Sequence, residues 1–189
     1  MIHFERSFDY ETIRAVMTHP LLYRHLSDDG SPPADQYKPI EDDRIWYIEA
    51  ERIDSDDFEL LGYWIFHPQN AVCWEVHTVL LPSAWGPTGQ LAACLLPAWI
   101  WANTPCRRIV TNVPTTNRLA LHFALKAGMR MYGVNEASYL KNGVLYDQIC
   151  LGITAPQERP MPEEETGLES RGEGREEESC QPQQQSSRP

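Results

Sequence analysis

The sequence predicts an α/β fold of the mixed α+β kind. A central mixed sheet of about seven strands is expected, flanked by about four helices. Two observations predict it. Strand and helix patterns alternate in the middle of the chain, which favours parallel strand–helix–strand connections. Strand patterns joined by short turns lie on either side, which favours antiparallel hairpins. The expected order of elements is β-α-α-β-β-β-α-β-α-β-β.

The N-terminal half predicts a short strand, two helices and three further strands. After "MIHF", the segment "DYETIRAVMTH" begins with Asp9, a residue type that often caps helices, and "LLYRHL" follows Pro20 as a shorter helix. The loop "SDDGSPPADQYKP" is rich in turn-forming residues. It leads to "RIWYIEAERI" and "FELLGYWIFH", which the turn "DSDD" joins into an expected hairpin, and then to the strand "AVCWEVHTVLL".

A helix is expected from about Gly89 to Ala102, and it contains Pro97. A proline inside a helix removes one hydrogen bond and crowds the preceding turn, so Pro97 should kink this helix or end it early. Helical spacing places four apolar residues on one face of the segment: Leu91, Leu95, Ala98 and Ala102.

The last part of the folded unit predicts a strand, a helix and two paired strands. "CRRIVTNV" is the strand, and "TTNRLALHFALKAG" is a helix with Thr116 near its start and Gly128 at its end. "MRMYGVNEASYL" and "GVLYDQICLGI" are joined by "KNG", in which Asn-Gly is a strong hairpin signal.

Composition divides the chain near Ala155. Residues 155–189 contain no aromatic residue, no Val and no Ile, and carry nine Glu against four Arg. Such a segment cannot bury enough apolar surface to offset its chain entropy. We therefore expect one folded domain, 1–154, and a disordered acidic tail, 155–189. The tail is read as a solubilising extension, with binding of a protein partner as the alternative.

Charge and cysteine content limit the classes of partner. The chain has 27 acidic and 16 basic residues, a net charge of −11, which argues against binding nucleic acid through its phosphates. No apolar run reaches the ~20 residues needed to span a bilayer, and no signal peptide is recognisable, so no membrane partner is expected. The five cysteines show no paired spacing. We expect reduced thiols, no metal site and a cytoplasmic location.

The stretch "LPSAWGPTGQLAACLL" changes from strand to helix through two glycines. A helix N-terminus offers unpaired amides and a favourable dipole to an anion, and glycine lets the backbone approach closely. The amides from Gly86 to Leu91, with the Thr88 hydroxyl, could hold a phosphate group in this way. The alternative is a tight turn with no ligand.

The order of elements and two motifs resemble the GNAT superfamily of acyl-CoA-dependent N-acetyltransferases. "VLLP", ending at Pro82, resembles the end of the family's fourth strand, and "NRLALHFALKAGM" matches its later helix motif. The resemblance covers nearly all of residues 1–154 and is sharpest from Glu75 to Gly133. The segment "LLPAWIWANTPCRRIVTNVPTTNRLAL" is similar to phage-encoded members.

The resemblance implies a GNAT-like acyltransferase domain that uses acetyl-CoA as the acyl donor and a small-molecule or protein amine as the acceptor. It implies that a backbone amide at Val79 or Leu80 polarises the acyl carbonyl, and that Asn117 contacts the pantetheine arm. The alternative role for Asn117 is a helix N-cap. The implied diphosphate cradle comprises Gly86, Thr88, Gly89, Gln90 and Leu91.

Three departures from the family pattern stand in the same motifs. Trp85 or Gly86 replaces the Arg or Gln that begins the family's loop, Gln90 or Leu91 replaces its final Gly or Ala, and Pro87 removes an amide. Ala124 stands where the family has its tyrosine acid. Substitutes for that acid are sought nearby: Tyr132 first, with Tyr139 and His122 as alternatives.

"WEVHTV" supplies candidates for the catalytic base. At strand period, Glu75, His77 and Val79 share one face. A carboxylate or imidazole there could accept the proton of an acceptor amine. The alternatives are a surface carboxylate at Glu75 and a structural histidine at His77.

The sequence is compatible with two classes of function. One is an active N-acetyltransferase. The other is a catalytically reduced GNAT-fold structural or assembly protein, associated with a phage virion or located in the host cytoplasm. A homodimer is left open. A carbohydrate-binding role for the six tryptophans is less favoured than core packing, because they are spread over several elements.

Overall fold

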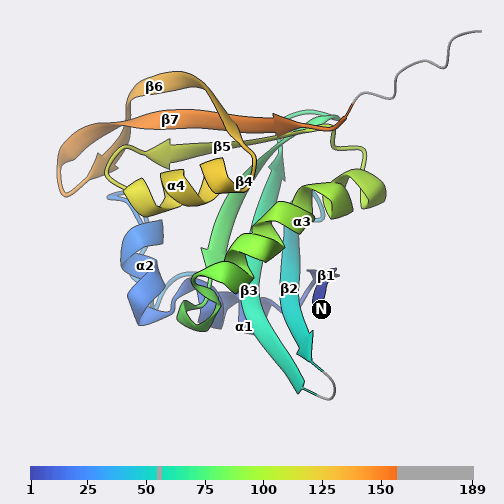
Figure 1. The fold of residues 1–189 in the computed structure, drawn as a ribbon. Coiled ribbons are helices and arrows are strands. Elements are labelled where there is room, and N and C mark those ends of the chain that lie inside the picture. The colour runs from blue at the N-terminus through green and yellow to red at the C-terminus, as the bar shows by residue number, and fades with distance from the viewer. Residues whose placement is uncertain (55–56, 157–189) are drawn as a thin grey trace, which may run out of the picture. The chain divides into compact units, whose positions relative to one another are not determined.

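A seven-stranded mixed sheet forms the centre of the molecule in the computed structural model, which describes residues 1–54 and 57–156 (Figure 1). The strand order is β1-β2-β3-β4-β5-β7-β6, and only β4 and β5 pair in parallel. The predicted fold class and order of elements are confirmed.

The elements are β1 (Ile2–Ser7), α1 (Tyr10–Met17), α2 (Pro20–Leu26), β2 (Trp46–Asp54), β3 (Asp57–Pro68), β4 (Cys73–Leu80), the 3-10 turn η1 (Pro82–Ala84), α3 (Pro87–Asn103), β5 (Arg108–Pro114), α4 (Arg118–Lys126), β6 (Arg130–Lys141) and β7 (Val144–Thr154).

Local sequence signals fix several element ends. Asp9 caps α1, where its carboxylate accepts a hydrogen bond from the Thr12 amide at 3.1 Å. The β6–β7 hairpin turns at Asn142 and Gly143, whose φ angles of 53° and 72° fit the positive-φ turn that Asn-Gly favours.

The helices cover both faces of the sheet. Ala92, Leu96 and Ile100 of α3 pack on one face in the larger core cluster. Ile13 of α1 and Leu22 of α2 pack on the other face in a second cluster. Figure 1 shows α3 and α4 in front of the sheet. One pair of helices, α3 and α4, therefore covers one face of the sheet, and α1 and α2 cover the other.

Helix α3 differs from the sequence prediction in two ways. It continues from Pro87 to Asn103, so the buried Pro97 does not end it early. Burial of its apolar face offsets the missing backbone hydrogen bond. The residues predicted to share a face do so, but that face is exposed; Leu91 and Leu95 are 53% and 44% exposed. The buried face comprises Gly89, Ala92, Ala93, Leu96, Pro97 and Ile100.

The predicted domain boundary lies at the end of the described chain. Strand β7 ends at Thr154, and the Ala155 amide donates to the Arg107 carbonyl at 2.7 Å. The predicted acidic tail lies outside the described residues from Gln157 onward. None of the described helices has the length and apolar character required to cross a bilayer.

Candidate active site

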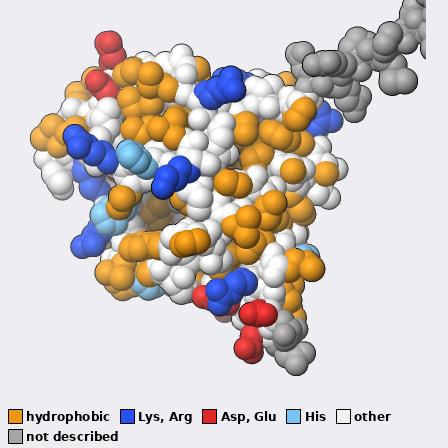
Figure 2. All heavy atoms as spheres, viewed as in Figure 1, with side chains coloured by type: hydrophobic (Ala, Val, Ile, Leu, Met, Phe, Trp, Pro, Cys, Tyr) orange, Lys and Arg blue, Asp and Glu red, His pale blue; other side chains and the backbone are white. Residues whose placement is uncertain are grey.

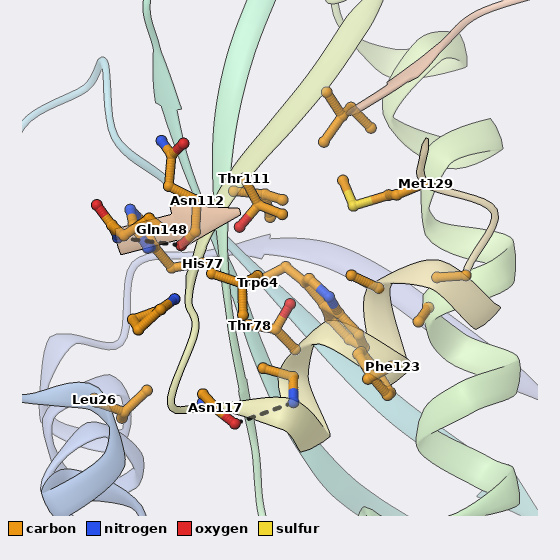
Figure 3. Close-up of a pocket in the computed structure, with 18 of the residues that line it drawn as sticks. Leu26, Trp64, His77, Thr78, Thr111, Asn112, Asn117, Phe123, Met129 and Gln148 are labelled. Carbon is orange, nitrogen blue, oxygen red and sulfur yellow. Dashed lines mark hydrogen bonds between the residues drawn. The ribbon is translucent and has the colours of Figure 1, made fainter. Parts of the chain in front are cut away.

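The parallel strands β4 and β5 separate after a short paired stretch. Their pairing runs only from Cys73 opposite Arg108 to Glu75 opposite Val110. Beyond it a cleft of about 400 Å³ opens between the strands, floored by Trp64, Val76 and Thr78 and walled by α3 and α4. Figure 3 shows His77, Asn112 and Gln148 on one side of this cleft and Phe123 and Met129 on the other.

A second hollow of about 240 Å³, called the side hollow here, adjoins the cleft. It lies on the α1 and α2 side of the sheet and is mostly apolar. His77 and Leu26 line both spaces. His77 is therefore the titratable side chain at the place where the cleft and the side hollow meet.

His77 is solvent-exposed and reachable from the cleft, although many protein atoms lie near its ring. Desolvation lowers its pKa from the usual 6.5, and the Glu75 carboxylate partly opposes this shift. The His67 ring packs edge-on against it, with 5.1 Å between ring centroids. His77 is thus neutral at pH 7 and able to accept a proton.

Glu75 shares a strand face with His77 but is held differently. Its two carboxylate oxygens accept hydrogen bonds from the side-chain amides of Gln69, at 3.2 Å, and Asn112, at 3.0 Å. It lines neither the cleft nor the side hollow. Of the two predicted bases, the structure brings only His77 to the cleft, and Glu75 acts on it through its charge.

The N-terminus of α3 exposes few of the predicted cradle amides. Gly86 is the N-cap with φ 103°, and Pro87 at the first position has no N–H. The Gln90 amide already donates to the Gly86 carbonyl at 3.0 Å. The amides without a helical partner are therefore those of Gly86, Thr88 and Gly89.

Three predicted cradle residues have other structural roles. Gly89 is buried, and a Cβ there would lie 2.5 Å from the Ala84 carbonyl oxygen, so the close approach it permits is to η1. The Gln90 side chain reaches α4 and donates to the Phe123 carbonyl at 3.4 Å. Leu91 is an exposed side chain within α3.

The end of β4 distinguishes the two predicted carbonyl-polarising amides. The Leu81 amide donates to the Leu61 carbonyl of β3 at 2.9 Å, and the Leu80 carbonyl accepts from the Trp85 indole at 3.0 Å. Because polar groups alternate along a strand, the Val79 amide faces β3 and the Leu80 amide faces the separated side. The Leu80 amide therefore lacks a β3 partner, but Leu80 is buried and lines neither the cleft nor the side hollow, while the Val79 side chain lines the side hollow.

Asn117 lines the cleft and also caps α4. Its side-chain oxygen accepts from the Ala120 amide at 3.1 Å, the dashed contact in Figure 3. Asn117 is therefore the N-cap of α4, the alternative role considered for it, and it also borders the cleft.

The structure brings Tyr139, rather than Tyr132, to the cleft. Tyr132 is 55% exposed and stacks under the Arg108 guanidinium, 5.0 Å from its ring centroid. Tyr139 lines the cleft, and its hydroxyl donates to the Ser27 carbonyl at 3.1 Å. Burial raises the pKa of Tyr139, which keeps it protonated at neutral pH. His122 lies on the exposed side of α4.

Sequence reasoning missed the amide side chains Asn112 and Gln148. Both line the cleft, and the Gln148 amide donates to the Asn112 carbonyl at 3.5 Å. The sequence feature that could have indicated Asn112 is a polar residue within the otherwise largely apolar strand "RIVTNVP". The pairing of β5 with β7 places Asn112 opposite Cys150 and so beside Gln148, which no local pattern reveals.

The loop after α2 is tied across one end of the cleft to the β6–β7 hairpin. The two Asp29 carboxylate oxygens accept from the Asn142 and Gly143 amides, each at 2.7 Å. The Lys141 ammonium donates to the Ser27 carbonyl. Figure 2 shows basic and histidine side chains over α4 beside the hollow that this loop borders.

Replacing Asp29 by alanine should lower the urea midpoint of unfolding at pH 7. The bonds from Gly143 and Asn142 lower the pKa of Asp29 from 3.8, so its contribution is complete above that value and is lost as the pH falls through the lowered pKa. Urea titrations between pH 7 and 3 should show parent and variant converging only in acid. Asp35→Ala, a nearby exposed carboxylate, is the control; a constant difference at all pH values contradicts the assignment.

The fold is similar to those of solved N-acetyltransferase structures. The spermidine N-acetyltransferase of Vibrio cholerae in complex with CoA and spermine is 15% identical, with TM-score 0.65 over 81% of this chain and 95% of that one. A putative phosphinothricin N-acetyltransferase is 17% identical, with TM-score 0.61 over 83% of this chain and all of that one. No protein-family model and no curated protein matches the sequence. The chain has the fold of the GNAT acetyltransferases.

Proposed function

We propose that this protein is an N-acetyltransferase that moves an acetyl group from acetyl-CoA to an amine. The observation that carries the proposal is the position of His77, a neutral imidazole where the cleft meets the side hollow. Two substrates could approach it from opposite sides of the sheet. The fold likeness to N-acetyltransferases, one of them with CoA bound, supports the same reading.

The residues of the cleft fit coenzyme A. The wall formed by Leu96 of α3, Phe123 of α4 and Met129 just after α4 is apolar and suits the pantetheine arm. The Thr88 amide, which has no helical partner and lies on a half-buried residue, suits the diphosphate, with the unpaired amide of the buried Gly89 behind it. Gly89 lies four residues before Ala93, which lines the cleft, so roughly 6 Å of helix separates the two regions. Acetyl-CoA would supply the activated acetyl group, and the Leu80 amide, which has no β3 partner, would be the β4 donor for its carbonyl oxygen if the buried end of β4 is reached.

His77 would remove the proton that prevents an amine from attacking. A lysine-like amine has a pKa near 10.4, so only about one molecule in a thousand is the free base at neutral pH. When the neutral His77 accepts that proton, the amine lone pair is free to form the amide bond. The carbon–sulfur bond breaks, and the thiolate leaves with a proton from a neighbouring acid.

Tyr139 is the proposed acid for the departing thiolate, which it could protonate once its hydroxyl leaves the Ser27 carbonyl. It is protonated at neutral pH and lies in the cleft lining. This phenol compensates for the alanine at position 124, the departure that favoured a catalytically reduced protein. Glu75 is a positioning residue, because its amide-held carboxylate supports His77 through its charge.

A charge placed at the helix N-terminus tests acetyl-CoA binding. Thr88→Glu should leave the unliganded protein as stable as the parent or more so, because a carboxylate there complements the helix dipole. The same carboxylate should repel the diphosphate. Acetyl-CoA at about 100 times its Kd should stabilise the parent by about 2.7 kcal/mol, measured as a shift in Tm, and should shift Thr88→Glu far less.

Thr88→Gln is the matched control, since it has the size of glutamate without its charge. It should retain most of the acetyl-CoA shift. A parent protein whose Tm and calorimetric titration show no response to millimolar acetyl-CoA would contradict the proposed function.

A further inference from the structure

The side hollow has a lining that discriminates between classes of amine. Resting on the proposed function, we infer that it selects the acceptor, and that the acceptor is a monoamine carrying a compact apolar or aromatic group rather than a polyamine. His77 stands where the amine would meet the cleft, and the apolar group would occupy the side hollow.

The lining of the side hollow is predominantly apolar. It includes Met17 from α1, Leu26 from α2, Ile65 from β3 and Val79 from β4. The side hollow has a volume of about 240 Å³. This is larger than an engineered protein cavity of about 150 Å³ that binds benzene. A phenyl ring on a two-carbon arm therefore fits the space.

The described polar groups that line the side hollow offer a polycation no negative charge. The Tyr47 hydroxyl accepts from the Ile40 amide at 2.9 Å and donates to the Ile40 carbonyl. Burial, with neighbouring Tyr47 and Tyr23, raises the pKa of Tyr37 to about 12, so it brings no negative charge. Among the described residues that line this hollow, the titratable nitrogen bases are Lys38, His67 and His77, and no carboxylate occurs.

A polyamine would therefore be poorly accommodated. Its second ammonium would lose water without gaining a carboxylate, and Lys38 would repel it. The carboxylate in the described lining of the adjoining cleft is Asp28, whose Oδ1 accepts hydrogen bonds from Gly30 and Ser31, and it lies outside the lining of the side hollow. A single amine beside His77 avoids this cost, because His77 takes its proton.

Three probe amines test the inference: phenethylamine, methylamine and spermidine. Binding is measured by calorimetry with CoA present, and acetyl transfer by kcat/KM. Phenethylamine should exceed methylamine by roughly tenfold or more, because only its ring buries apolar surface in the side hollow. Spermidine should rank below phenethylamine in both measurements.

Lys38→Glu should reverse part of this preference. The exchange puts a carboxylate at the exposed rim of the side hollow and should raise spermidine binding severalfold relative to phenethylamine. Arg130→Glu is the matched control, with the same change of charge on an exposed residue of β6. It should leave the ranking of the amines unchanged.

The outcomes separate this inference from the proposed function. Acetyl transfer that favours spermidine over phenethylamine overturns the inference and leaves the acetyltransferase proposal standing. Equal responses of Lys38→Glu and Arg130→Glu also overturn it. Phenethylamine binding that responds to Lys38→Glu, without acetyl transfer to any amine, supports the selective hollow and contradicts the proposed function.

Discussion

Replacing His77 by glutamine should lower kcat for acetyl transfer by about 10²- to 10⁴-fold, the usual contribution of a general base. Glutamine retains a polar side chain of similar length but cannot accept a proton at neutral pH. Affinity for acetyl-CoA should change by no more than a few-fold, because His77 belongs neither to the α3–α4 wall nor to the start of α3, which are proposed to hold the cofactor. Steady-state kinetics and calorimetry on the same preparations measure the two quantities.

The pH dependence adds a second signature. Because desolvation lowers the pKa of His77 from 6.5, more than half of the imidazole is neutral at pH 6.5, so the midpoint of the acid limb of kcat/KM should lie below pH 6.5. That acid limb should flatten in His77→Gln. His67→Gln is the control, since it removes the packed neighbouring ring without removing the proposed base. A His77→Gln enzyme as fast as the parent would show that the base lies elsewhere, with Glu75 tested next by Glu75→Gln.

Replacing Gly62 by valine should destabilise the protein by about 3 kcal/mol or more, which lowers Tm by roughly 10 °C for a domain of this size. Gly62 has φ 136°, and a Cβ there would lie 2.2 Å from the Val79 carbonyl oxygen and 2.9 Å from the Leu80 Cα. Neither backbone atom can move without shifting the end of β4. Urea unfolding and thermal melts of the unliganded protein measure the effect.

Gly86→Ala separates conformational strain from steric conflict. Gly86 also has positive φ, at 103°, but a Cβ there would meet nothing within 4 Å. Its replacement should cost only about 1–2 kcal/mol. Equal losses for Gly62→Val and Gly86→Ala would mean that the contact between Gly62 and β4 does not determine the position of the strand end.

Local signals predicted most of the fold because each acts within a few residues. Asp9 caps α1 through Thr12, and Asn142–Gly143 closes the last hairpin, as their residue types indicate. Helix α3 shows where such signals fail. Its residues are apolar almost all round, so spacing identified a helix but not its buried face, and packing against the sheet carried it through Pro97.

The candidate site was predictable only in part, for a related reason. Strand period placed Glu75 and His77 on one face, but their different roles depend on Gln69 and Asn112, which reach Glu75 from a loop and from β5. Tyr139 lies in the cleft because the loop after α2 meets the distant β6–β7 hairpin at Ser27. The Asn112 and Tyr139 contacts join residues 37 and 112 positions apart, and spacing along the chain carries no information about them.

Acetyl transfer itself is the most direct measure of the central proposal. The parent protein, incubated with acetyl-CoA and phenethylamine, should release free thiol and form N-acetylated phenethylamine in equal amounts. A thiol assay measures the first product and mass spectrometry the second. His77→Gln should form both products at least a hundredfold more slowly, as expected for the loss of a general base. Thiol release without an acetylated amine, or equal rates in parent and variant, would contradict a transfer reaction that depends on His77.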